Sequence, residues 1–407
     1  MHTRDLKFKV NPQELRDKFK YIAVILITLI ISGSAVANIF PIMMPCRAIL
    51  ALLFIIPFFN SLAHKWRRIF IYFASFGTMF TLSLIMNHDN YKYILMVLFN
   101  IFIGYAMATS LDNIKFMKTF LNIMTLTAAV SIVCYFLLNF TSVNLPFTVR
   151  SSFNGVRYGV GYIFNYLIYS KWRNCGMFWE PGLMATFMIF SLLIDSIVFK
   201  SPNKLRTAIY FTAAILTNSS AGIIILLLCV AFILFRNYGK EKASKTEILL
   251  FLFTIIIVIF VFLEYDNIIN LIIEFGNSKI QSVAKKLLSD NLSSSQRMNS
   301  IIFWWNRFLS SPLWGTGIGS VNENFIWDTA TSFMFLGLFG LLGATYTIAW
   351  IRGIMKLRLN FSSRIILCVI ILLILNKEPH AALMFSWFLL FSLLCNGLGT
   401  VKDSEKA

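Results

Sequence analysis

The sequence predicts an all-α polytopic integral membrane protein, and three observations lead to this fold class. The 407-residue chain is 58% hydrophobic and 13% charged, whereas about a quarter of the residues in a soluble domain are charged. Its apolar residues form repeated runs close to the length of about 20 residues that a helix needs to cross a bilayer. Its basic residues lie in short clusters between these runs. We therefore expect residues 1–407 to form a single polytopic membrane domain.

The charge distribution argues against a nucleic-acid-binding protein. The formal net charge is +18, but the basic clusters form no continuous basic face. Positive charge between apolar runs is instead typical of loops that orient membrane helices. Membrane lipids are therefore expected partners, and nucleic acid is not.

The apolar runs predict about twelve membrane-spanning helices, several of them short. They cover residues 21–40, 47–63, 69–86, 93–109, 119–140, 182–199, 205–217, 221–235, 247–264, 332–351, 364–376 and 381–398. The polar segment 217–222, Thr-Asn-Ser-Ser-Ala-Gly, favours a turn between two short helices over one bent helix. With this turn and a cytoplasmic N-terminus, 24 of the 36 lysines and arginines lie on the cytoplasmic side, as the positive-inside rule requires. Both termini are then cytoplasmic, and the first apolar run, which lacks a cleavage pattern, is expected to remain as an anchor.

Two long loops are expected on the outer side, at about residues 141–181 and 265–331. Long loops often carry function, so these are the expected location of an active site. Residues 267–288 have apolar positions at helical spacing, which fits either an amphipathic helix on the outer leaflet or a packed loop helix. The six cysteines and four histidines show no metal-ligand spacing, so we expect no metal and no cofactor.

The two loops carry more cations than is usual for translocated segments. These cations are Arg150, Arg157, Lys171 and Arg173 in the first loop, and Arg297 and Arg307 in the second. Guanidinium groups bind phosphate through paired hydrogen bonds, so the group predicts a phosphate or pyrophosphate ligand at the outer face. Contact between the arginines and lipid phosphates is the alternative interpretation.

A carboxylate lies at the end of the first loop, in the segment 173–182, Arg-Asn-Cys-Gly-Met-Phe-Trp-Glu-Pro-Gly. Glu180 stands directly before a proline, which is typical of a helix start, where the helix dipole favours a negative charge. A second Glu-Pro pair begins at Glu378 and is followed by His380. Glu180 either caps its helix or serves as a general base, and His380 is a weaker candidate for that role.

A glycine run, Trp-Gly-Thr-Gly-Ile-Gly-Ser at residues 314–320, lies in the second loop. Its alternate glycines, Gly315, Gly317 and Gly319, permit backbone conformations closed to other residues. Such a run can bind phosphate through backbone N–H groups, or it can form a tight turn that returns the chain to the membrane. It follows no strand and lacks a lysine, so a nucleotide-binding loop is not expected.

These motifs resemble those of O-antigen polymerases, which are similar in turn to O-antigen ligases. The resemblance rests on Arg-x-x-Gly-x-Phe-x-Glu-Pro-Gly at 173–182, on the Arg297 segment followed by Ser-Pro-Leu-x-Gly-Thr-Gly-Ile-Gly, and on the break at 217–222. The family often has an arginine where this chain has Ser220. An arginine-x10-glycine element of some members fits Arg150 and Gly161 but has no counterpart in the second loop.

The resemblance implies an enzyme of the bacterial inner membrane, with about a dozen helices and two large periplasmic loops. The expected function is polymerisation of a surface polysaccharide from oligosaccharide repeat units linked to undecaprenyl pyrophosphate, by metal-independent glycosyl transfer. Arg173 and Arg297 would stabilise the pyrophosphate charge, and Glu180 would orient or deprotonate the acceptor, or hold an arginine. Arg150, Arg157 and Arg307 would support substrate binding. A chain-length regulator protein is a further partner that the resemblance allows.

Two alternatives stay open. An O-antigen ligase would transfer the glycan to a lipid A core, but ligases of the superfamily usually carry a histidine where this chain has Asp-Thr-Ala-Thr-Ser at 328–332. A flippase or transporter of lipid-linked oligosaccharide belongs to a different class and should have charged residues in the middle of its helices. Only Asp195 falls well inside a predicted span, which favours the polymerase.

Overall fold

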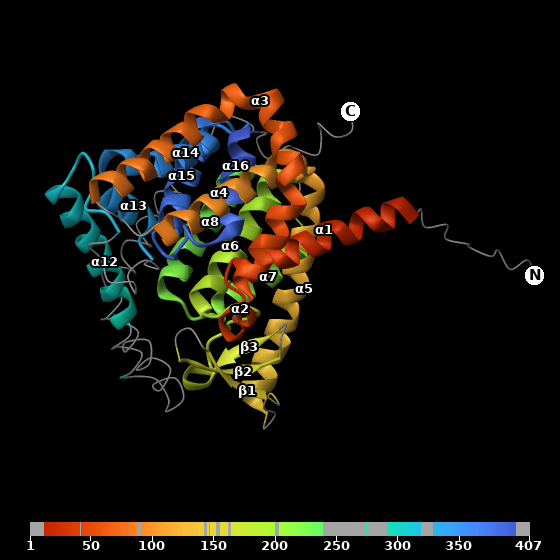
Figure 1. Cartoon of the computed structure of the whole chain (residues 1–407). Coiled ribbons are helices and arrows are strands. Elements are labelled where there is room, and N and C mark those ends of the chain that lie inside the picture. Colours follow the sequence, from red (N-terminus) through yellow and green to blue (C-terminus); the bar gives the residue numbers. More distant parts are fainter. Residues whose placement is uncertain are drawn as a thin grey trace, which may run out of the picture.

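The protein is a bundle of apolar helices with a small sheet at one end (Figure 1). The computed structural model describes residues 12–40, 42–87, 91–141, 145, 147–151, 155–161, 164–199, 203–238, 274, 291–318 and 329–395. Within this part of the chain, four helices are long and apolar enough to cross a membrane, and several shorter helices are also apolar. The membrane character and the mostly helical fold agree with the sequence prediction.

The elements follow in this order. The first helices are α1 (Pro12–Ile31), α2 (Ala35–Ile39), α3 (Met43–Asn87), α4 (Tyr91–Ser110) and α5 (Asn113–Phe140). The first long loop contains β1 (Phe147–Arg150), β2 (Arg157–Val160), β3 (Asn165–Leu167) and the 3₁₀ turn η1 (Ile168–Ser170). The next described helices are α6 (Pro181–Val198), α7 (Lys204–Ile215), α8 (Ser220–Tyr238) and α12 (Asn291–Ser310). The last are α13 (Thr331–Phe339), the 3₁₀ turn η3 (Gly340–Gly343), α14 (Ala344–Met355), α15 (Phe361–Leu375) and α16 (Met384–Cys395).

Helix α6 lies at the centre of the bundle, and all its residues are buried. It packs against α5, α7 and α8, and Figure 1 shows it enclosed by the other helices. A helix that is apolar on every side is stable only when neighbours cover its whole surface. The first turn of α6 is therefore held inside the protein, and this fixes the position of the Glu-Pro-Gly sequence that starts it.

The first long loop is not irregular. Its three strands form an antiparallel sheet in the order β1-β2-β3, with Arg150 paired to Arg157. The strands are short, three or four residues each, and contain aromatic and β-branched residues that favour extended structure. The all-α prediction therefore did not include this sheet. The serine, asparagine and glycine residues of the loop obscured the strand pattern in the sequence.

Four predicted spans differ from the helices observed. Spans 47–63 and 69–86 belong to one helix, α3, because no glycine or proline lies between residues 58 and 76 to end it. Its two arms meet at an angle at the top of Figure 1. The span 21–40 is divided at Gly33 and the span 332–351 at Gly340, and both glycines have a positive φ, 112° and 60°.

The predicted break at 217–222 agrees with the structure, where α7 ends at Ile215 and α8 begins at Ser220. The predicted span 247–264 lies outside the described residues. So does the predicted amphipathic segment 267–288, except for Glu274. The number of spans and the side of the membrane on which the loops lie stay predictions.

The glycine run packs against the divided helix α13–η3. The backbone N–H groups of Gly315 and Gly317 donate to the carbonyls of Ser311 (2.9 Å) and Leu338 (3.1 Å). Gly315 has φ +73°, and a Cβ there would lie 2.1 Å from the Leu338 carbonyl oxygen. This close backbone contact requires glycine, and it holds the second loop against the bundle.

Substituting Gly315→Ala should therefore destabilise the protein by about 2 to 5 kcal/mol, the sum of left-handed backbone strain and overpacking. Thermal unfolding of the purified protein in detergent measures the effect. Gly77→Ala is the matched control, because nothing lies within 4 Å of a Cβ built at Gly77. Equal melting temperatures for the two variants would contradict the packing role of Gly315.

Candidate active site

The structure brings the two Glu-Pro sequences together. One starts α6, and the other lies in the connection between α15 and α16. The Lys377 ammonium donates hydrogen bonds to the Gly182 carbonyl oxygen and to Thr186 Oγ1 (3.0 Å) on α6. It also forms an ion pair with Glu378 Oε1 at 3.2 Å. Lys377 and Glu378 are both buried, with exposed fractions of 2% and 0%. The ion pair lies between sequence neighbours, and the hydrogen bonds of Lys377 to Gly182 and Thr186 join the two distant parts of the sequence.

The start of α6 leaves room for the Glu378 carboxylate. A Cβ at Gly182 would lie 2.5 Å from Glu378 Oε1, so only glycine allows the carboxylate to approach this turn. Glu180 occupies the N-cap position with an extended backbone, but its side chain makes no capping hydrogen bond. Because the carboxylate does not cap α6, the geometry favours a role for Glu180 other than helix capping.

Side chains from several helices hold the connection between α15 and α16. Thr331 Oγ1 on α13 donates to the Glu378 carbonyl oxygen (3.0 Å) and accepts from the His380 N–H (2.9 Å). Asn100 Nδ2 on α4 donates to the carbonyls of Ala381 and Ala382, both at 3.3 Å. Backbone groups that leave a helix inside an apolar bundle must find other partners. These bonds supply the partners and fix the orientation of the acidic side chain.

The Glu378 carboxylate lies against the first turn of α6, and Glu180 is the N-cap residue of that turn. Burial, the negative charge of Glu378 and the hydrogen bond with it raise the pKa of Glu180 to about 8. Burial opposes ionisation of Glu378 too, but the Lys377 ammonium and the Glu180 hydrogen bond outweigh it and lower the pKa of Glu378. One carboxyl therefore keeps its proton near neutral pH while the other is ionised.

The second loop contributes Arg297 to this group of charges. Arg297 lies on α12, and its positive charge lowers the pKa of Glu180, Glu378 and Lys377. Burial is the largest cause of the lowered pKa of Lys377, and Glu378 opposes it. Arg297 therefore acts electrostatically on Glu180, although 117 positions separate the two residues in the sequence.

His380 follows Glu378 by two residues, and its side chain is buried. Its Nδ1 lies 2.7 Å from Ser386 Oγ, and its ring packs edge-on against Phe190. Nε2 is buried without a hydrogen-bond partner in the described part of the chain. Burial lowers the pKa of His380 to about 4, so the imidazole is neutral at physiological pH. Its buried position suits packing within the α15–α16 connection better than contact with a substrate.

Arg173 contacts the break between α7 and α8. Its Nε donates to the Thr217 carbonyl oxygen at 3.3 Å, and its guanidinium lies 5.9 Å from the centre of the Trp172 ring. Nearby, the Asn174 N–H donates to the Leu216 carbonyl oxygen and Asn218 Nδ2 donates to the Trp172 carbonyl oxygen. These bonds attach the first loop to the α7–α8 break, so Arg173 has a structural contact whether or not it also binds pyrophosphate.

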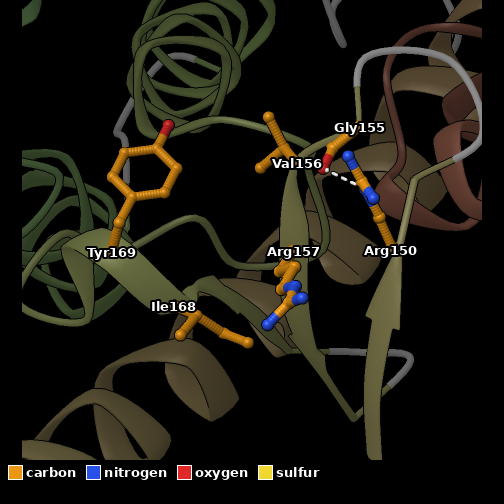
Figure 2. A pocket seen from close by; sticks show the side chains of 6 residues that line it. All are labelled: Arg150, Gly155, Val156, Arg157, Ile168 and Tyr169. Carbon is orange, nitrogen blue, oxygen red and sulfur yellow. Dashed lines mark hydrogen bonds between the residues drawn. The ribbon is translucent and has the colours of Figure 1, made fainter.

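Arg150 and Arg157 line an open groove of about 440 Å³ beside the small sheet (Figure 2). Arg150 Nε donates to the Gly155 carbonyl oxygen at 3.0 Å. The side chain of Tyr169 forms another part of the groove, and this residue is 72% exposed. Two guanidinium groups and an exposed aromatic ring are suited to an anionic glycan or a phosphate.

Arg307 is attached to the glycine run. Its NH1 donates to Thr316 Oγ1 at 2.9 Å, and its guanidinium lies 5.0 Å from the centre of the Phe303 ring. The N–H groups of Gly315 and Gly317 already donate to carbonyls, which favours the tight-turn interpretation of the run over a phosphate cradle. Gly319 lies outside the described residues.

Lys377 and Glu378 were the site residues that sequence reasoning did not select. The signal was present, since a lysine and a second Glu-Pro pair interrupt an otherwise apolar region.

In the described part of the chain, no three His, Cys, Asp or Glu side chains are grouped as metal ligands. No protein-family model matches this chain, and no curated protein matches it either.

Substituting Lys377→Met should destabilise the protein by about 3 to 5 kcal/mol, because it leaves the buried Glu378 carboxylate without its cation. The double variant Lys377→Met/Glu378→Gln should recover most of this loss, since it removes both buried charges. Lys204→Met, at an exposed position, is the control and should change stability by about 0.5 kcal/mol or less. Additive effects in the double variant would show that the two residues do not interact.

The raised pKa of Glu180 predicts a pH dependence of stability. The ordinary pKa of a glutamate side chain is 4.5, whereas the folded protein keeps the Glu180 proton up to about pH 8. The contribution of this proton to the free energy of unfolding is therefore complete at low pH and is lost as the pH rises between these two values. Glu180→Gln should therefore remove one proton's share of the slope, about 1.4 kcal/mol per pH unit. Melting temperatures of both proteins, measured from about pH 5 to about pH 9, test this; parallel curves would contradict it.

Proposed function

We propose that this chain is a glycosyltransferase of the bacterial inner membrane that polymerises a surface polysaccharide from oligosaccharide units carried on undecaprenyl pyrophosphate. The observation that carries the proposal is that Lys377 and Glu378 lie against the start of a buried helix whose N-cap residue is Glu180, with the charge of Arg297 acting on this group. It provides a carboxyl group with a raised pKa beside fixed positive charge. Such a group is suited to accept a proton from a sugar hydroxyl.

In the proposed reaction, the hydroxyl oxygen of one repeat unit attacks the anomeric carbon of another. A bond forms between these atoms, and the bond from the anomeric carbon to the phosphate oxygen breaks, with the electron pair leaving on the lipid pyrophosphate. The hydroxyl proton passes to ionised Glu180. Arg297 stabilises the charge that develops on the pyrophosphate, as fixed cations do in other group transfers.

The groove at Arg150 and Arg157 supplies a second binding region in this proposal. It lies beside the sheet of the first loop and would hold the glycan or its phosphate while the reacting atoms meet at Glu180. In the proposed topology, the two long loops are periplasmic, both termini are cytoplasmic, and a chain-length regulator is a further partner. Arg173 and Arg307 would support the loops through their contacts with Thr217 and Thr316.

One observation favours a second candidate, a transporter of the lipid-linked unit. Lys377, Glu378 and His380 lie buried in a connection that divides two apolar helices. Buried charges at a helix break are typical of transport sites. An O-antigen ligase would use the same donor and differ only in its acceptor.

Deleting the gene in the source bacterium and restoring it with variants tests the proposal. Wild type should restore long-chain polysaccharide, whereas Glu180→Gln and Arg297→Ala should leave mainly single-repeat glycolipid at equal protein level. Glu14→Gln, which changes an exposed carboxylate on α1, is the control and should restore the polymer.

The glycolipid that accumulates separates the candidate functions. Single repeat units exposed on the outer face indicate a missing polymerase. Unattached polymer indicates a missing ligase, and units retained on the inner face indicate a missing transporter. Full-length polymer from both site variants would remove the catalytic assignment.

A further inference from the structure

We infer that Glu180 and Glu378 share a single proton and act as one carboxylic acid–carboxylate pair, with Lys377 as the residue that positions Glu378. This pair goes beyond a single general base. Its use in glycosyl transfer rests on the proposed function, but the shared proton itself does not.

The geometry allows one arrangement of charge. Glu378 Oε1 faces the Lys377 ammonium at 3.2 Å, and Gly182 leaves the space that this carboxylate occupies. Glu378 Oε2 is buried and has no N–H donor or hydroxyl donor in the described part of the chain. Glu180 is the N-cap residue of the same turn, two positions before Gly182, so a proton on its carboxyl is the donor that would satisfy the buried carboxylate. Two adjacent carboxylates rarely both ionise in such a place.

Lys377 decides which member is ionised. Its ammonium is fixed by the Gly182 carbonyl oxygen and Thr186 Oγ1 as well as by Glu378. It contacts Glu378 directly and acts on Glu180 only as the weakest of the neighbouring charges. The negative charge is therefore held on Glu378, and the proton on Glu180.

The other charged or titratable groups that face the pair come from three places. Arg297 approaches from α12, His380 follows in the α15–α16 connection, and Cys175 lies in the first loop on the chain segment of Glu180. His380 is neutral, because burial lowers its pKa to about 4, and burial raises the pKa of Cys175 to about 12. Arg297 is then the cation that balances the pair when its shared proton leaves.

The pair accepts a proton in its fully ionised form. Loss of the shared proton to water gives two carboxylates, and transfer of the acceptor hydroxyl proton to Glu180 restores the acid–carboxylate pair. Each cycle therefore moves one proton from hydroxyl to solvent and leaves the pair unchanged. Activity should rise with pH towards the apparent pKa of the pair, which belongs to both residues together.

Infrared spectroscopy of the purified full-length protein in detergent tests the shared proton without any substrate. As the pH is raised from about 5 to about 10, wild type should lose one protonated-carboxyl C=O band with an apparent pKa near 8. Glu180→Gln should lack this band. In Glu378→Gln, the Glu180 band should titrate at least about one pH unit lower, a tenfold weaker hold on the proton.

The double variant Lys377→Met/Glu378→Gln guards against misfolding of the single variant, because it leaves no unpaired buried charge. It should show the same downward shift, since Glu378 affects the Glu180 carboxyl more than Lys377 does. Glu14→Gln is the control and should leave the band unchanged.

An unshifted Glu180 band in folded Glu378→Gln or in the folded double variant would overturn the shared proton, because burial alone would then explain it. A wild type without the band would do the same. Neither result depends on polymer formation, so the spectra judge the pair and the complementation experiment judges the proposed function.

Discussion

The buried ion pair between Lys377 and Glu378 is the interaction on which the arrangement of this region depends. Removing two charges from water costs several kcal/mol per ion, so the surrounding structure has to supply good geometry and extra hydrogen bonds. Gly182 provides space for the carboxylate, and its carbonyl together with the Thr186 hydroxyl completes the partners of the ammonium. The central helix α6 is thereby tied to the connection between α15 and α16.

The polar backbone groups at the ends and breaks of the helices also need partners inside the protein. Gly33 divides the first apolar run, and its carbonyl accepts the Trp179 N–H at 3.0 Å. On the other side of the first loop, the Asn174 N–H donates at 2.9 Å to Leu216, at the end of α7. Exposed backbone groups within an apolar bundle must be paired. The loop before α6 supplies these partners, which is why its polar sequence lies between two helix breaks.

The sequence was sufficient to predict the apolar helices, the turn at 217–222 and the helix that starts after Glu180, because length, composition and a Glu-Pro helix start are local signals. It was insufficient for α3, since two apolar runs joined by helix-forming residues look the same whether they turn or continue. The meeting of Glu180 with Glu378 was also hidden. Their 198-residue separation is closed by the hydrogen bonds of the buried Lys377, in the α15–α16 connection, to Gly182 and Thr186 on α6, and no local pattern encodes that contact.

The pKa of Glu180 explains why a pair of carboxyl groups suits the proposed chemistry better than a single glutamate. A glutamate with an ordinary pKa is a weak base towards a sugar hydroxyl, whereas a raised pKa strengthens the base at the cost of keeping it protonated near neutral pH. A pyrophosphate arriving near Glu180 would raise that pKa further and hold the proton in place. Arg297 opposes this effect, since its charge favours the ionised carboxyl. In the proposed reaction, Arg297 would therefore have two effects: it would balance the charge of the phosphate, and it would keep Glu180 able to release its proton.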